Sequence, residues 1–165
     1  MRRPAPEPVQ VVKSRRDAAL AWLTGGVPYI GFLGMQFDRR GDEVTAILPF
    51  QAMLIGNPML PALHGGATAA FLEVTAIISL SFASLWQGIE DGQISDFSGL
   101  PDLPKTINFG VDYLRAGLPR DAYARARVNR IGRRYASVQV EAWQDNVAKP
   151  FALGSGRFLM AGDAG

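Results

Sequence analysis

The sequence predicts an α+β fold in which a curved antiparallel sheet wraps around one long buried helix. Residues 65–85 are apolar on nearly every face, a pattern typical of a helix that protein encloses on most sides. Residues 122–128 and 136–142 alternate apolar and polar side chains, as half-buried strands do. A single sheet that curls around the apolar helix is the simplest way to bury both sets of apolar residues.

A short helix is expected before the sheet. Apolar residues recur at near-helical spacing over residues 14–24, and Gly25 and Gly26 then end the pattern. Residues 1–13 carry Pro and Glu where a signal peptide needs an apolar run, so we expect a flexible leader there. The chain has 165 residues, a length suited to one domain, which we place at residues 14–161.

The sheet is expected to be antiparallel because most connections between its strands are short. Matching the apolar faces pairs Val128 with Val138 and sets Arg125 opposite Glu141. This register leaves residues 132–134 as a three-residue hairpin loop. The expected strands are residues 32–37, 44–50, 106–114, 122–128, 136–142 and 148–160, and residues 51–63 are expected to form a loop.

The composition excludes several kinds of site. The chain has no cysteine, which rules out disulfides, thiolate metal sites and cysteine nucleophiles, and its single histidine argues against a zinc site, so we expect no metal. A net charge of +2 is too small to indicate a nucleic-acid partner. Residues 67–86 could span a membrane by length, but Glu73 lies inside this stretch and no basic flank anchors it. We therefore expect a cytoplasmic protein without a membrane partner.

The sequence LHGGATAAFLEV contains the clearest functional motif. His64, Gly65 and Gly66 lead into the predicted long helix, and Glu73 follows nine residues after His64. This pattern resembles the LHGG motif of hotdog-fold acyl-CoA thioesterases of the phenylacetate-pathway and 4-hydroxybenzoyl-CoA types. The resemblance extends over residues 31–160 and includes the GRR hairpin and the FGVDYLRAG strand.

The resemblance implies a hotdog fold and the hydrolysis of an acyl-CoA thioester to a free acid and CoA. Coenzyme A enters as part of the substrate, so no separate cofactor is expected. The resemblance also implies a homo-oligomer, either a dimer or a dimer of dimers (a homotetramer). In the roles that it implies, the Gly65 backbone amide polarises the thioester carbonyl, and Glu73 attacks the thioester carbon directly or through an activated water.

Physical chemistry supports these roles. A helix N-terminus presents unpaired amides and a partial positive charge, and glycine lets a carbonyl approach the backbone closely. Glu73 is the one ionisable residue on the apolar helix, where an isolated carboxylate is costly unless it is paired. The alternative for Glu73 is a structural buried acid that is paired with an arginine. We expect His64 to orient the site or to bond to the thioester; alternatively, it caps the helix or fills the core. Asn57 is a further catalytic candidate, although it lies seven residues before His64 and the family residue often lies six before.

The spacing of the two main candidates has a consequence for assembly. Eight residues of helix separate Gly65 from Glu73, which places them about 12 Å apart along the axis. One carbonyl cannot touch both. We therefore expect Gly65 of one protomer and Glu73 of its neighbour to complete each site across a twofold interface.

Arginines at the predicted hairpin tip are candidates for binding the CoA phosphates, because a guanidinium offers forked donors to oxyanions. We assign substrate binding to Gly66, Gly132, Arg133 and Arg134. The alternative is that the arginines only form a solvated outer face.

Two other functions fit a fold of this kind. The first is a hotdog dehydratase or enoyl hydratase, but in those enzymes the histidine lies well upstream of the helix and precedes Phe-Pro-Gly, whereas here His64 directly precedes Gly65 and Gly66. The second is a module that binds acyl-CoA without turnover.

Overall fold

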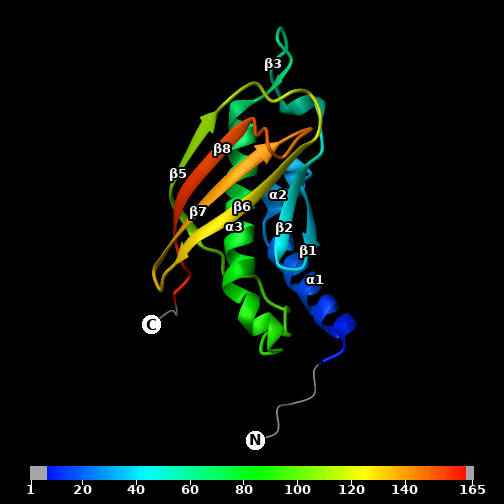
Figure 1. Cartoon of the computed structure of the whole chain (residues 1–165), viewed down its shortest axis with the longest axis vertical. Coiled ribbons are helices and arrows are strands. Elements are labelled where there is room, and N and C mark those ends of the chain that lie inside the picture. The colour runs from blue at the N-terminus through cyan, green and yellow to red at the C-terminus, as the bar shows by residue number, and fades with distance from the viewer. Residues whose placement is uncertain (1–6, 163–165) are drawn as a thin grey trace, which may run out of the picture.

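The computed structural model describes residues 7–162 of the chain. Its sheet has six antiparallel strands in the order β1-β2-β6-β7-β8-β5 and curves around α3, while α1 runs beside α3 (Figure 1). The helices are α1 (Val9–Gly25), α2 (Pro28–Leu33), the 3-10 turn η1 (Ala52–Leu54) and α3 (Gly65–Glu90). The strands are β1 (Gln36–Arg40), β2 (Glu43–Leu48), β3 (Ile55–Asn57), β4 (Ala62–Leu63), β5 (Lys105–Tyr113), β6 (Ala122–Ile131), β7 (Tyr135–Trp143) and β8 (Ala152–Leu159). The α+β class predicted from the sequence is confirmed.

Helix α3 forms the centre of the core. Phe71, Leu72 and Ile78 are fully buried, and Phe82 is 1% exposed. Burying side chains of this size stabilises the fold by about 2 kcal/mol each. Of the described helices, α3 alone is long and apolar enough to cross a membrane, yet 61% of its most apolar stretch is buried inside the protein. Its apolarity is thus explained by the sheet and by α1, which cover most of its surface.

The β6–β7 hairpin has the predicted register. Val128 pairs with Val138 and Arg125 pairs with Glu141, so residues 132–134 form the three-residue loop. The Gly132 amide donates to the Tyr135 carbonyl at 2.9 Å and closes this loop. Alternating apolar residues determined the register because a slip by one residue would turn them to the solvent face.

Helix α1 begins earlier than the sequence indicated. It starts at Val9, not at residue 14, so residues 9–13, which we had assigned to the leader, are helical. Pro8 precedes the helix, and its carbonyl accepts the amides of Val11 and Val12 at 2.9 and 3.3 Å. The first turns of α1 are mostly exposed and carry little periodic signal, which is why the pattern missed them. Residues 1–6 of the expected leader lie outside the described residues.

The first predicted strand was wrong in part. Residues 28–33 form α2, and β1 begins only at Gln36. Pro28 stands in the first turn, where proline is favoured, and Gly34 ends the helix in a left-handed conformation with φ of 68°. The apolar run that follows Gly31 concealed this short helix. Residues 51–63, predicted as a loop, contain η1 and the small β3–β4 hairpin.

An ion pair joins α1 to the end of α3. The Arg16 guanidinium donates to both carboxylate oxygens of Glu90, at 2.5 and 2.7 Å, and lies 4.6 Å from the centre of the Trp86 ring. Both side chains of the pair are about three-quarters buried, at 24% and 27% exposed. This contact fixes α1 against the core helix far from the start of α3.

Replacing Glu90 with Gln should lower the unfolding temperature by about 2–4 °C at neutral pH, because a bidentate, partly buried pair contributes on the order of 1 kcal/mol. Hydrogen bonding from Arg16 holds the pKa of Glu90 below its ordinary value of 4.5. The stabilisation is therefore complete above that value and is lost as the pH falls through the lowered pKa. Calorimetry of the two proteins should show their unfolding temperatures converging in acid; a difference that stays constant would contradict the assignment.

Candidate active site

His64 caps the start of α3. Its Nδ1 atom accepts a hydrogen bond from the Gly66 amide at 2.9 Å, so in the neutral ring the proton is on Nε2. A Cβ atom on Gly66 would lie 3.0 Å from Nδ1 and Cε1 of the ring, and one on Gly56 would lie 2.7 Å from the His64 Cα. Two glycines thus make room for the histidine. The side chain of His64 therefore caps the helix, which is one of the alternatives that the sequence left open.

Gly65 is the first residue of α3, a position whose amide has no acceptor within the helix. The carbonyl on the same residue accepts a hydrogen bond from the Tyr113 hydroxyl at 2.7 Å. The His64 carbonyl, in the preceding peptide group, accepts from the Thr68 amide at 3.0 Å. Within residues 7–162, no hydrogen bond is formed by the Gly65 amide. A helix N-terminus with a free amide and a partial positive charge is suited to an oxyanion.

Glu73 lies on a face of α3 that the chain leaves partly open. It is half-buried, as are Ala69, Ala70 and Ile77 on the same face, whereas Leu72 and Val74 on either side of it are buried. Across the described part of the chain, no ion pair or hydrogen bond involves its carboxylate. A single protomer therefore does not enclose this acid, because the sheet covers the other faces of the helix.

Asn57 has a structural use. Its Oδ1 atom accepts the amides of Met59 and Leu60 at 3.0 and 3.3 Å, which holds the turn between β3 and β4. Asparagine commonly forms a turn of this kind. The turn η1, which precedes this hairpin, contacts His64, whose amide donates to the Leu54 carbonyl at 2.7 Å. The catalytic role expected for Asn57 stays a prediction.

The GRR hairpin lines a basic cavity of about 610 Å³. Four arginines surround it, and within residues 7–162 none of the four is in an ion pair or a side-chain hydrogen bond. By contrast, Arg16, Arg39 and Arg125 are each paired with a carboxylate. The cavity is lined by Arg130, Arg133, Arg134 and Arg157, together with Ile107, Gly132, Tyr135, Ala136 and Ser137. Unpaired guanidiniums beside an aromatic ring form a site suited to a phosphorylated aromatic ligand.

Sequence reasoning found only part of this cavity. Arg133 and Arg134 are adjacent in the sequence, but Arg157 comes from β8 and reaches the cavity because it pairs with Ser137 of β7. Ile107 comes from β5, on the far side of β8. The sequence predicted a strand at residues 148–160, but it did not show the strand order that brings these residues together.

The helix start and the basic cavity lie at opposite ends of the sheet. Tyr113, at one end of β5, reaches Gly65, while Lys105, at the other end, pairs with Leu159, which in turn pairs with Tyr135 beside the hairpin. These eight steps along a strand correspond to about 26 Å. One chain therefore does not bring all the predicted site residues together.

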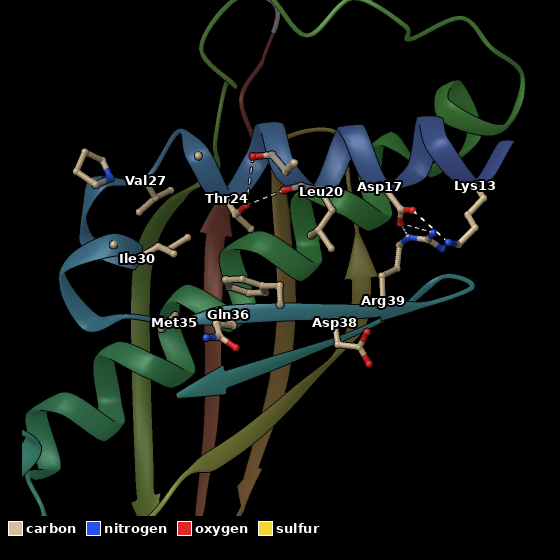
Figure 2. Close-up of a pocket in the computed structure, with 15 residues that line it drawn as sticks. Lys13, Asp17, Leu20, Thr24, Val27, Ile30, Met35, Gln36, Asp38 and Arg39 are labelled. Atoms are coloured by element: carbon tan, nitrogen blue, oxygen red, sulfur yellow. Dashed lines mark hydrogen bonds and ion pairs between the residues drawn. The ribbon is translucent and has the colours of Figure 1, made fainter. Parts of the chain in front are cut away.

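A separate cavity of about 790 Å³ lies between α1, α2 and β1 (Figure 2). One end is apolar, with Val27 and Ile30, and the other holds the ion pairs of Asp17 with Arg39 and Lys13 (Figure 2). None of the residues predicted for the site lines it.

Comparisons with known proteins agree with this architecture. Residues 60–150 match the model of the thioesterase superfamily. A protein from Chromobacterium violaceum is 29% identical, with a TM-score of 0.60 over 92% of this chain and 96% of that one. A phenylacetic acid degradation-related protein from Ralstonia eutropha JMP134 is 19% identical, with a TM-score of 0.63 over 86% and 98%. A protein from Bacillus halodurans, solved with CoA, is 20% identical, with a TM-score of 0.62 over 96% of each chain. No curated protein matches the chain.

Replacing His64 with Ala should lower the free energy of unfolding by about 1 kcal/mol, because the Gly66 amide loses its acceptor. Replacing His64 with Asn should retain most of the stability, since asparagine is a favourable N-cap. Urea denaturation of the three proteins measures both changes. Equal losses in the two variants would show that the imidazole stabilises the chain by packing, not by capping.

Proposed function

The chain belongs to the thioesterase superfamily, and we propose that it hydrolyses an acyl-CoA thioester to a free acid and CoA. Two groups of α3 that lack a hydrogen-bond or ion-pair partner within the described part of the chain support this proposal. The Gly65 amide has no acceptor and the Glu73 carboxylate has no partner among the described residues. A thioester carbonyl can interact with both groups, because its oxygen becomes negative and suits the amide, while its carbon accepts a nucleophile and suits the carboxylate.

The Gly65 amide stabilises the negative charge that develops on the carbonyl oxygen during attack. Glu73 acts in one of two ways. As a nucleophile, its oxygen bonds to the carbonyl carbon, the C–S bond breaks, CoA leaves as a thiol after taking up a proton, and water hydrolyses the anhydride. As a general base, it takes a proton from the water that attacks the carbon, the C–S bond breaks, and the departing CoA sulfur takes up that proton. His64 positions the helix start in either case.

A twofold pair of chains completes the site in this proposal. Strand β5 is an edge strand, so one side of its backbone is free to pair with another strand. Tyr113 of β5 reaches Gly65, and Val111 pairs with Gly154, whose position is in contact with Leu72. Along the β5 edge, Gly65 therefore lies at the level of Tyr113, and Leu72 lies at the level of Val111.

Antiparallel pairing of two β5 strands places the two α3 helices antiparallel. If the twofold axis crosses β5 between Val111 and Tyr113, Gly65 of one chain comes to the level of Leu72 in its partner. Glu73 is the next residue and lies on the open face of α3. Pairing of this kind would form a site shared by two protomers and would cover a carboxylate that one chain leaves partly exposed.

The basic cavity binds the nucleotide end of CoA in this scheme. CoA carries three phosphates and an adenine, which match unpaired guanidiniums and the exposed ring of Tyr135. The long pantetheine arm separates this end from the thioester. The similar protein from Bacillus halodurans was solved with CoA, which supports the same ligand class for this chain.

Replacing Glu73 with Ala or Gln should reduce turnover of a susceptible acyl-CoA by about 10²- to 10⁴-fold, because the nucleophile or base is lost. Release of free thiol across a panel of aryl and acyl thioesters measures this effect. Glu90→Gln, on the same helix but outside the site, is the matched control and should retain wild-type turnover. Hydration of an enoyl-CoA without thiol release would indicate a hydratase, and binding without any turnover would indicate a binding module.

Replacing Arg133 and Arg134 together with Gln should raise the KM for acyl-CoA by about 10-fold or more, since charge-assisted bonds to phosphate are lost. The kcat should be unchanged, and so should the KM for the matching acyl-pantetheine, which lacks the nucleotide. Arg40→Gln, an exposed arginine outside the cavity, serves as the control. An equal rise in KM for both substrates would exclude nucleotide binding by this hairpin.

A further inference from the structure

The peptide group between Gly65 and Gly66 is held at both ends. Its carbonyl accepts the Tyr113 hydroxyl at 2.7 Å, and its amide donates to the Nδ1 atom of His64 at 2.9 Å. The preceding peptide group, which carries the Gly65 amide, is held at its carbonyl by the Thr68 amide. Two side chains and one backbone group thus fix both peptide planes that meet at the Gly65 Cα.

Such fixing matters because glycine is the most mobile residue of the backbone. A helix start with two successive glycines would otherwise have many orientations of the free amide, and a mobile donor stabilises an oxyanion poorly. A side chain on Gly65 could restrict this motion, but its Cβ would lie 3.3 Å from the Tyr113 hydroxyl and 3.4 Å from the Cζ atom of the ring. The tyrosine would have to shift by a few tenths of an ångström to admit such a side chain.

Tyr113 has little structural reason to be a tyrosine. It lies at the end of an edge strand and is 54% exposed in a single chain, so its ring contributes little to the core of that chain. Its hydroxyl bonds to the backbone of one residue, Gly65, from which it is distant in the sequence. The hydroxyl therefore acts on the start of α3.

We propose that Tyr113 is a positioning residue for the oxyanion-binding amide: its hydroxyl fixes the Gly65–Gly66 peptide so that the Gly65 amide points at the substrate carbonyl. This inference rests on the proposed function, because it assigns Tyr113 to the same reaction. It assigns no proton transfer to the phenol and no contact with substrate. Its effect is confined to ligands that present a carbonyl oxygen to the Gly65 amide.

Two CoA analogues that are not hydrolysed test this role by titration calorimetry. One is a ketone in which a methylene replaces the thioester sulfur, so that the carbonyl remains. The other is the matching alkyl-CoA thioether, which has no carbonyl. The wild-type protein should bind the ketone more tightly. Tyr113→Phe should weaken ketone binding by about 3- to 10-fold, the loss of one neutral hydrogen bond, and leave thioether binding unchanged. Loss of folded protein would lower the binding stoichiometry for both analogues equally.

Tyr113→Met, which also lacks the hydroxyl, should give the same selective loss, and this result excludes a perturbation of the helix start by the phenyl ring of the first variant. Tyr29→Phe, on α2 and stacked on Phe32, is the matched control and should bind both analogues as the wild type does. If both Tyr113 variants keep the wild-type preference for the ketone, the positioning role is excluded and the hydrolase proposal stands. If the wild type binds neither analogue, the proposed function itself fails.

Discussion

Eight residues of rigid helix keep the backbone of Gly65 and that of Glu73 about 12 Å apart along the axis, and the proposed function depends on that separation. The amide is unpaired and the carboxylate lacks a partner among the described residues. Each group has the chemistry that a thioester carbonyl requires, yet one carbonyl cannot reach both within a chain. In the proposed function, the helix therefore supplies two halves of two sites and not one whole site.

The other elements of the fold bury most of this helix and hold its first residues. The sheet buries most of α3 and leaves open the face that carries Glu73. His64 and Tyr113 hold the helix start, one as its cap and the other from the edge strand β5. Strand β5 thus contributes to the proposed site in two ways. The Tyr113 side chain bonds to Gly65 of its own chain, and the free edge of the strand can pair with a second chain. The basic cavity lies about 26 Å away along the sheet, at the distance where a long carrier, not the reacting group, is expected.

Local patterns predicted some features and missed others for physical reasons. The pairing of Val128 with Val138 could be read from alternation alone, because burial of one face determines register. The motif at His64 indicated the helix start and its acid. Helix α2 was missed because an apolar run of a few residues has no distinguishing period. The contact of Tyr113 with Gly65 depends on strand order and on tertiary packing, which no pattern within one segment contains.

Subunit complementation tests the shared site most directly. Gly65→Pro removes the amide, and the preceding His64 already has the extended conformation that proline requires, with φ of −61° and ψ of 131°. The added ring requires the Tyr113 side chain, which is exposed, to move by a few tenths of an ångström. Gly65→Pro and Glu73→Ala should each be inactive alone. When the two are unfolded and refolded together, mixed dimers should regain one intact site each, or about a quarter of wild-type activity overall. If both variants are inactive and their mixture stays inactive although mixed dimers form, each site lies within a single chain and the account is wrong.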